Sequence, residues 1–182
     1  NALEGNLGKS FVIGMPALPL IVERMPATLE LALSAMILAI GIGIPLGMWA
    51  GLRPDSISGK VIMGGSILGF SLPSFWVGLM MIMIFAVEWG LLPSTGRGET
   101  VTVGGIRLSF LTLDGLSHML LPAINLALYK VSLVIRLTRA GMREAMHQDY
   151  VKFARAKGLS TTRVIFVHVM RNILIPVVTI LG

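Results

Sequence analysis

The sequence predicts an all-α protein that crosses a membrane several times. Of its 182 residues, 54% are hydrophobic and only 13% are charged, whereas soluble domains carry about 25% charged residues. Two stretches, 31–52 and 61–87, contain no charged residue, and each exceeds the roughly 20 apolar residues that a membrane helix needs. A chain with so little polar surface could not cover a water-soluble fold of this size, so a bilayer is its predicted solvent.

Four membrane spans are expected, all within one transmembrane domain over residues 28–182. Residues 1–27 precede this domain as an extracytoplasmic segment. The spans are predicted at about 28–52, 61–89, 118–139 and 164–182, with a cytoplasmic loop at 140–163. Pro45 and Pro73 lie inside the first two spans, where membrane helices tolerate proline because neighbouring groups satisfy the freed backbone.

Small residues recur every four positions within the first two spans. Gly43, Gly47 and Gly51 have this spacing, and so do Gly65 and Gly69. Small residues four apart lie on one helix face and let two membrane helices approach closely, so both spans are expected to pack through their glycines. The alternative is chance, because glycine is frequent in membrane helices.

The basic residues predict the side of the membrane on which each connection lies. Ten of the fifteen lysines and arginines fall in two regions, 53–60 and 136–171. Cytoplasmic connections of membrane proteins carry an excess of Lys and Arg, so these two regions are placed in the cytoplasm. Residues 1–27 and 90–117 are then placed outside, and the four spans cross the membrane in alternating directions.

The cytoplasmic loop contains a short predicted helix with a favourable residue at each end. Asp149 suits an N-cap and Gly158 a helix stop, and Ser160, Thr161 or Thr162 can cap the next helix. The residues expected to share one face of the short helix are Tyr150, Phe153, Ala154 and Lys157. Because a helix of two turns is too short to be stable alone, we expect a cytoplasmic partner or the membrane surface to hold it. The other interpretation is a solvated connecting loop.

The same loop resembles a known motif. Residues 149–159 read DYVKFARAKGL, and His168, the pair RN at 171–172 and PVVT at 176–179 follow. This pattern resembles the coupling-loop motif of ABC importer permeases, and more narrowly that of the first permease in dipeptide, oligopeptide and nickel importers. Segments that resemble the same family, in the same order, lie upstream at 5–10, 24–31, 73–76 and 121–123. The general motif begins Glu-Ala-Ala where this chain has Lys152-Phe153-Ala154, so a role of that glutamate cannot be carried over.

The resemblance implies a type I ABC importer permease fold of six spans, four of which are present here. The chain begins with Asn and ends just as its last apolar run completes, so it is expected to be an interior fragment of a longer protein. The implied function is the membrane permease, as first (B-type) subunit, of an ATP-driven peptide importer in the bacterial inner (plasma) membrane. The implied partners are a second permease, two ATP-binding subunits, an extracytoplasmic peptide-binding protein and membrane lipid, with no nucleic acid.

The resemblance also implies how the work is divided among the subunits. The partner subunits bind and hydrolyse ATP, so the chain itself is expected to be no enzyme and to hold no cofactor. It would transmit their motion through the coupling loop. The implied contact residues of that loop are Asp149, Tyr150, Phe153, Ala154, Arg155, Ala156, Lys157 and Gly158. The substrate stays open among dipeptides, oligopeptides, glutathione-like molecules and nickel chelates.

A polar stripe runs along the third predicted span. Its members, spaced four, three, four and three apart on one helix face, are Asn125, Tyr129, Ser132, Arg136 and Arg139. Polar groups in lipid are costly, so this face is expected to look at protein or at a translocation cavity. Lys130, near the middle of the span, pairs with a carboxylate of the missing half of the permease or lines the path. The alternative is a side chain that reaches water inside the cavity and has little role. The predicted path residues are Asn125, Tyr129, Lys130 and Ser132, and the alternative is a buried helix contact.

Other chemical signals are weak. Gly8-Lys9-Ser10 ends like a phosphate-binding loop, but the glycine required five positions before Gly8 is missing. The three histidines are far apart in the sequence, so no metal site is predicted, and no nucleophile–base pattern predicts a catalytic residue. Two rival classes stay open. An intramembrane enzyme would place paired ionisable residues on two spans, and an ATP-independent secondary transporter would not need the short cytoplasmic helix.

Overall fold

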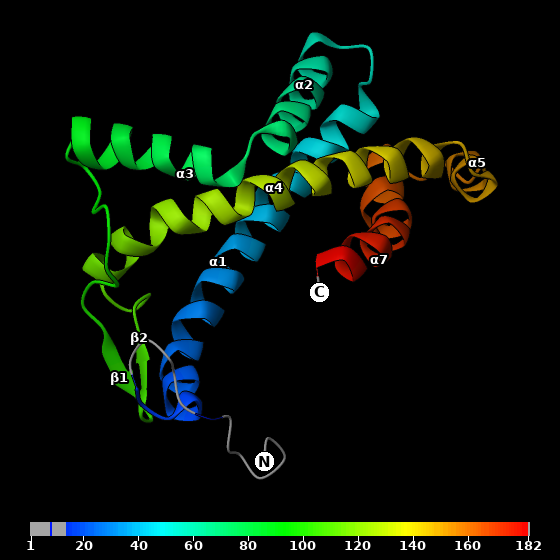
Figure 1. Cartoon of the computed structure of the whole chain (residues 1–182). Helices are drawn as coiled ribbons and strands as arrows, with labels where there is room; N and C mark the ends of the chain where they lie inside the picture. The colour runs from blue at the N-terminus through cyan, green and yellow to red at the C-terminus, as the bar shows by residue number, and fades with distance from the viewer. Residues whose placement is uncertain (1–7, 9–13, 182) are drawn as a thin grey trace. The chain divides into compact units, whose positions relative to one another are not determined.

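The computed structural model describes residue 8 and residues 14–181, and these are mostly helical (Figure 1). They form two compact units. One contains the chain up to Ser34 together with Met80–Ala123, and the other contains Ala35–Leu79 together with the chain from Ile124 onward. The family-like segment at 5–10, apart from Gly8, and the first part of the predicted segment 1–27 lie outside the described residues.

Three helices in the described part of the chain are long and apolar enough to cross a membrane. They are α1 (Ala17–Leu52), α4 (Leu113–Met146) and the helix over Thr161–Thr179. α1 has 36 residues and α4 has 34. At about 1.5 Å per residue both are roughly 50 Å long, which is more than the hydrocarbon core of about 30 Å. α1 therefore begins well before residue 28, and α4 continues past residue 139.

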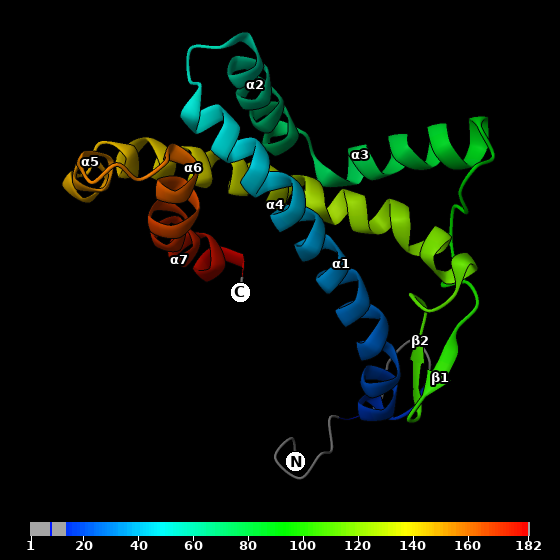
Figure 2. The same cartoon turned by 180° about the vertical axis from the view of Figure 1, so that it is seen from behind.

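The second predicted span is broken rather than straight. α2 (Ile57–Ser71) is followed two residues later by α3 (Ser74–Met81), which continues as the π-helical segment η2 (Ile82–Glu88). The two arms meet at 101°, and Figures 1 and 2 show the abrupt turn. Pro73 has no N–H to donate and disfavours helical angles in the residue before it. Leu72 accordingly has extended angles, φ −78° and ψ 134°.

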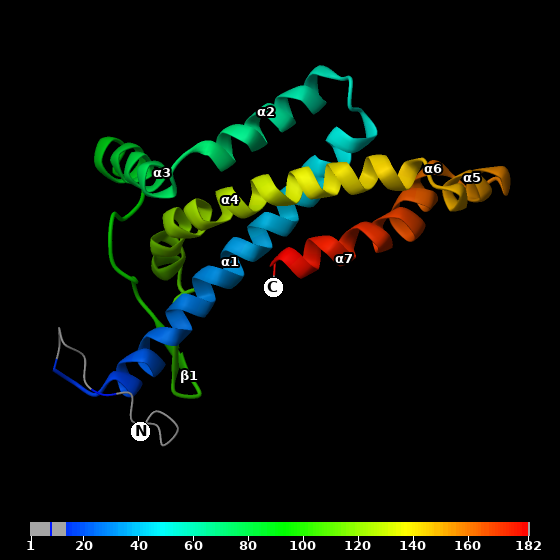
Figure 3. The same ribbon diagram turned by 45° about the vertical axis from the view of Figure 1, so that its right-hand side comes forward.

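The loop at 147–163 turns the chain back on itself within the second unit. α5 (Asp149–Ala156) and α6 (Thr161–Arg163) are followed by η3 (Val164–Val169) and α7 (Met170–Leu181). Figure 3 shows α7 running back along α4, with α5 and α6 at the turn. Ser160 caps α6 by accepting the Arg163 N–H at 3.4 Å, so this predicted cap is confirmed.

α1 and α4 contact each other through the predicted glycines of the first span. Gly43, Gly47 and Gly51 lie against Val134, Thr138 and Met142, in that order. A Cβ atom at any of the three glycines would lie 2.6–2.7 Å from the opposing side chain, far inside van der Waals contact. These six residues form a glycine seam. In the next span Gly69 packs against Ser132, whereas Gly65 has nothing within 4 Å.

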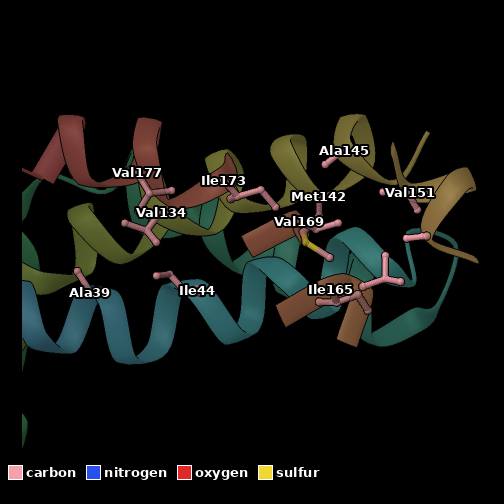
Figure 4. Close-up of a cluster of buried hydrophobic side chains, with 12 residues drawn as sticks. Ala39, Ile44, Val134, Met142, Ala145, Val151, Ile165, Val169, Ile173 and Val177 are labelled. Atoms are coloured by element: carbon pink, nitrogen blue, oxygen red, sulfur yellow. The ribbon is translucent and has the colours of Figure 1, made fainter. Parts of the chain in front are cut away.

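The hydrophobic core of the second unit lies where α1, α4, α5, η3 and α7 meet (Figure 4). Its buried members are Ala39, Ile44, Val134, Met142, Ala145, Val151, Ala154, Val164, Ile165, Val169, Ile173 and Val177. Two of them, Val151 and Ala154, come from α5. The short helix α5 is therefore packed into this core.

The first unit contains a small hairpin that the sequence analysis did not predict. β1 (Val101–Val103) pairs with antiparallel β2 (Ile106–Leu108). The turn residues Gly104 and Gly105 have φ of 58° and 84°. A type I′ turn requires positive φ at both positions, which glycine adopts without strain. Strands of three residues are too short to produce a recognisable alternation of polar and apolar residues.

Candidate functional site: a short helix and a cavity

The first turn of α5 differs by one residue from the sequence prediction. Gln148 is the N-cap, with φ −70° and ψ 152°, and its side chain makes no capping hydrogen bond. Asp149 is the first helical residue, so its prediction as N-cap was wrong. Its carboxylate accepts a hydrogen bond from Lys152 Nζ at 2.8 Å. Aspartate is favoured both at the N-cap and in the first turn, where it complements the helix dipole, so residue type alone does not separate the two positions.

The end of α5 confirms the predicted helix stop at Gly158. Gly158 has φ +77°, a left-handed conformation that glycine adopts freely. Its N–H donates to the Arg155 carbonyl at 2.9 Å, and the Leu159 N–H donates to the Ala154 carbonyl at 3.2 Å. This pair of hydrogen bonds is a Schellman motif, which closes a helix sharply. α5 is therefore a discrete element with a defined end.

The two faces of α5 differ in burial. Val151 and Ala154 are buried in the core of the second unit, whereas Lys152 and Arg155 are exposed and Phe153 keeps 70% of its surface. The four residues predicted to share a face all line one hollow of about 570 Å³, together with Leu159 and His168. α5 thus fastens itself to its own chain with one side and presents aromatic and basic groups on the other.

Tyr150 lies between this hollow and a second one. The second hollow, of about 270 Å³, is lined by Tyr150 with residues of α4 and α7, among them Glu144 and Asn172. The Tyr150 hydroxyl is buried and has no hydrogen-bond partner among the described residues. A buried hydroxyl without a partner is uncommon in native structures, so α5 itself carries an unused hydrogen-bonding group at this position.

The polar stripe of α4 faces the broken span within the second unit. Tyr129 stacks on Phe70 with ring centroids 4.8 Å apart, and the Arg136 guanidinium carbon lies 4.3 Å from the centre of the same Phe70 ring. Ser132 donates to the carbonyl of Leu128, one turn back on its own helix, at 2.8 Å, and it lies against Gly69 of α2. Much of the stripe is therefore in contact with another helix of the same chain.

A cavity of about 450 Å³ adjoins this contact. From α4 it is lined by Asn125, Leu126, Leu128, Tyr129 and Lys130, and from the broken span by Gly69, Phe70, Leu72, Ser74 and Val77. Three of the four predicted path residues thus share one cavity. The fourth, Ser132, is buried in the helix contact and does not line it.

The sequence analysis missed a buried ionic group in the first unit. Glu30 of α1 is 7% exposed, and its carboxylate accepts hydrogen bonds from Arg97 Nη2 at 3.2 Å and from the Ser109 N–H at 2.7 Å. Arg97 also donates to Ser109 Oγ at 3.0 Å and to the Arg107 carbonyl. These bonds fasten the connection that carries the hairpin to α1. The available signal was a glutamate within the predicted span 28–52, immediately before its charge-free run.

The described residues contain no group of three His, Cys, Asp or Glu side chains that could hold a metal ion.

Residues 43–182 match the protein family described as "Binding-protein-dependent transport system inner membrane component". The match includes α5, the glycine seam and the membrane cavity.

Similar curated proteins are peptide permeases of bacteria. The chain is 38% identical to the dipeptide transport system permease protein DppB of Escherichia coli K12 over 99% of its length. It is 39% identical to the di/tripeptide transport system permease protein DppB of Pseudomonas aeruginosa and 40% identical to the oligopeptide transport system permease protein AppB of Bacillus subtilis, in both cases over its whole length. It spans 58%, 58% and 56% of these three relatives, respectively.

Proposed function

Because the chain belongs to the family of inner membrane components of binding-protein-dependent transport systems, we propose that it forms part of the membrane pathway of an ATP-driven peptide importer. Three relatives at 38–40% identity are named as permeases of dipeptide, di/tripeptide and oligopeptide transport systems. These names support peptides as the cargo, and the family description supports the bacterial inner membrane as the location. The membrane-crossing helices provide the route.

α5 is the proposed contact with an ATP-hydrolysing partner. Its exposed side carries Phe153, Lys152 and Arg155, an aromatic group between two cations. Aromatic side chains and arginine are enriched where proteins bind one another. The Schellman motif at Gly158 holds the helix to two turns, so it presents a compact knob that a groove on a partner can enclose.

The packing of α5 supports its role in transmitting motion. Val151 and Ala154 belong to the core that also contains residues of α4, η3 and α7. Protein interiors are close-packed and deform little, so a partner that displaces α5 also displaces the helices on either side of it. Nucleotide would then bias an equilibrium between two states of the pathway because the ATPases hold α5 differently in each state.

The proposed assembly contains a second permease, two ATP-binding subunits and an extracytoplasmic peptide-binding protein. In this assembly ATP is bound and hydrolysed by the partner subunits. The chain contributes the pathway and the coupling helix, with no catalytic residue, cofactor or metal of its own. Membrane lipid surrounds the spans, which expose many large apolar side chains along α1, such as Leu29, Leu33 and Ile37.

The observation that carries this proposal is the family match across a segment in which α5 is anchored on one face and exposed on the other. The test is disulfide or photochemical crosslinking from Phe153→Cys in the assembled importer. The chain has no native cysteine, so a single introduced thiol reports one position. We expect crosslinks to an ATP-binding subunit, with a yield that changes between the nucleotide-free and the ATP-bound states.

Ile57→Cys is a matched control, because Ile57 is 82% exposed, belongs to the other predicted cytoplasmic connection and lies outside α5. It should give a weaker crosslink that responds less to nucleotide. The proposed function is wrong if the crosslinker at position 153 reacts only with lipid or water in every nucleotide state. It is also wrong if peptide uptake continues without ATP.

A further inference from the structure

We propose that the cavity between α4 and the broken span is a transient binding site for the carboxylate end of a transported peptide. Lys130 provides the opposite charge. This inference rests on the proposed function and names a substrate contact for it. It follows from three observations within the second unit: the break in the span, the unpaired cation, and an unpaired amide oxygen.

The break at Leu72–Pro73 shapes the cavity. Residues from both arms line it, with Gly69, Phe70 and Leu72 before Pro73, and Ser74 and Val77 after it. Irregular backbone at membrane depth is tolerated where it is buried in protein or lines a water-filled cavity, and transporters build substrate sites at such discontinuous helices. A volume of about 450 Å³ lies within the range of roughly 300–1,000 Å³ for small-molecule sites.

Lys130 brings a positive charge to this cavity. It lies near the middle of α4, where a lysine costs at least about 2.5–3.5 kcal/mol on insertion scales. Within the part of the chain that the structure describes, it makes no ion pair; the carboxylates that do so are Glu30, Asp114 and Asp149. A peptide carboxylate that arrives and leaves would neutralise Lys130 for part of each cycle and leave the site free afterwards.

Asn125 supplies the complementary polar group. Its Oδ1 is buried and has no hydrogen-bond partner among the described residues, although the residue lines the cavity. A free peptide at neutral pH carries both a carboxylate and an N–H-rich amino end. The cation at position 130 suits the first, and the amide oxygen at position 125 suits an N–H. Tyr129, stacked on Phe70, adds an aromatic wall to the same cavity.

This arrangement divides the four predicted path residues. Asn125, Tyr129 and Lys130 contact the substrate. Ser132 does not, because its hydroxyl donates to the Leu128 carbonyl and its side chain packs against Gly69. The competing explanation is a permanent ion pair between Lys130 and a carboxylate of another subunit. That pair would close the cavity to anions, so accessibility separates the two explanations.

The experiment uses the complete importer in proteoliposomes, with Leu126→Cys as a reporter in the cavity. Leu126 lines the cavity and is 50% exposed. Thiol modification is measured with an anionic and a cationic methanethiosulfonate reagent of similar size. We expect the anionic reagent to react about tenfold faster because Lys130 attracts it, and Lys130→Met in the same background to abolish this preference. Leu120→Cys on the same helix, outside the cavity, should show no preference of this kind.

Substrate protection and uptake complete the test. Dialanine with ATP should slow the modification of Cys at position 126 several-fold, and Lys130→Met should lower dialanine uptake about tenfold while Lys130→Arg retains most of it. Equal rates for the two reagents, no reaction in any nucleotide state, or no protection by dialanine would overturn the inference. Peptide-stimulated ATP hydrolysis by the same complex is measured in parallel. If this hydrolysis is normal while the thiol experiments give a negative result, only the proposed carboxylate site is disproved. If the wild-type complex shows no peptide-stimulated hydrolysis, the proposed function itself is wrong.

Discussion

The connection at 90–112 and the loop that contains α5 both join candidate membrane spans, and they are held in place by different chemistry. α5 is held by apolar burial of Val151 and Ala154, and its charges stay exposed. The connection at 90–112 is held by a buried carboxylate, Glu30, that binds Arg97 and a backbone N–H. Apolar packing has no directional requirement, whereas a buried ionic group holds one geometry and is costly to disturb.

The difference bears on the proposed role of α5. A helix that passes a partner's movement on to its neighbours needs close-packed apolar contacts that deform little. The connection at 90–112 is instead held in one geometry by the Glu30 group. Changes at the two fastenings should therefore have different magnitudes and different consequences, and the following substitutions test this from the largest effect to the smallest.

Arg97→Met should have the largest effect. It leaves the Glu30 carboxylate buried without its cation, which costs about 3–5 kcal/mol when one member of a buried pair is removed. Because the Ser109 N–H donates to Glu30 at 2.7 Å, the expected readout is faster hydrogen exchange at the Ser109 amide. Arg107→Met serves as the control because the Arg107 side chain makes no contact with Glu30 in the described network. Unchanged exchange at Ser109 would show that the ionic fastening is not what holds the connection.

Gly47→Val should destabilise the glycine seam between α1 and α4. A Cβ at this position would lie 2.6 Å from Thr138 Cβ and 2.8 Å from the Ile135 carbonyl oxygen, so the two helices must separate. Overpacking of this kind costs about 1–3 kcal/mol, measured as a lower thermal unfolding temperature in detergent. Gly41→Val lies on the same helix with nothing within 4 Å and should change the unfolding temperature little. Equal shifts for both variants would contradict close contact at the seam.

Val151→Ala and Phe153→Ala should separate the two faces of α5. The first removes a side chain that is 0% exposed and should lower the stability of the permease by about 1–2 kcal/mol. The second removes a side chain that is 70% exposed, so stability should change by less than about 0.5 kcal/mol. Its effect should appear instead as reduced co-purification of the ATP-binding subunits. The assignment of faces would be reversed if Phe153→Ala destabilised the chain more than Val151→Ala.

Asp149→Asn should have the smallest effect. The ion pair between Asp149 and Lys152 is largely exposed, and pairs of this kind contribute about 0.2–1 kcal/mol or less. Its thermal unfolding temperature should remain within error of the wild type, and any difference should vanish at high salt. A large loss of stability would mean that Asp149 is in fact buried, against a partner or within the chain.

The features that could be predicted from the sequence depend on contacts near in the chain or on regular spacing. Gly158 ends a helix because of its own backbone freedom, and Gly43, Gly47 and Gly51 form a contact surface because a helix places every fourth residue on one face. The membrane-crossing helices follow from runs of apolar residues. Local chemistry determines each of these features, and the structure contains the helix end at Gly158, the glycine seam and the long apolar helices.

The features that could not be predicted depend on pairs that are remote in the sequence. Glu30 and Arg97 are 67 positions apart, and neither carries a local mark of its partner. Pro73 predicted a disturbance of the second span, but a bend of 101° depends on how α2 and α3 each pack against α4. The cavity at Lys130 is likewise a product of that packing, so the sequence could identify an unusual lysine without showing what surrounds it.

The glycine seam has a mechanical consequence for any transport cycle. Because three glycines of α1 have no side chain, α1 and α4 approach closely at three successive turns within the second unit, where the glycines lie against Val134, Thr138 and Met142. Rotation of either helix at these turns would bring atoms into steric clash. We expect the glycine seam to keep these parts of the two helices together within the second unit. Bending must then occur where consecutive helices lack such an interlock, and the Leu72–Pro73 junction, with no continuous ladder of amide hydrogen bonds, is the natural pivot of the second unit.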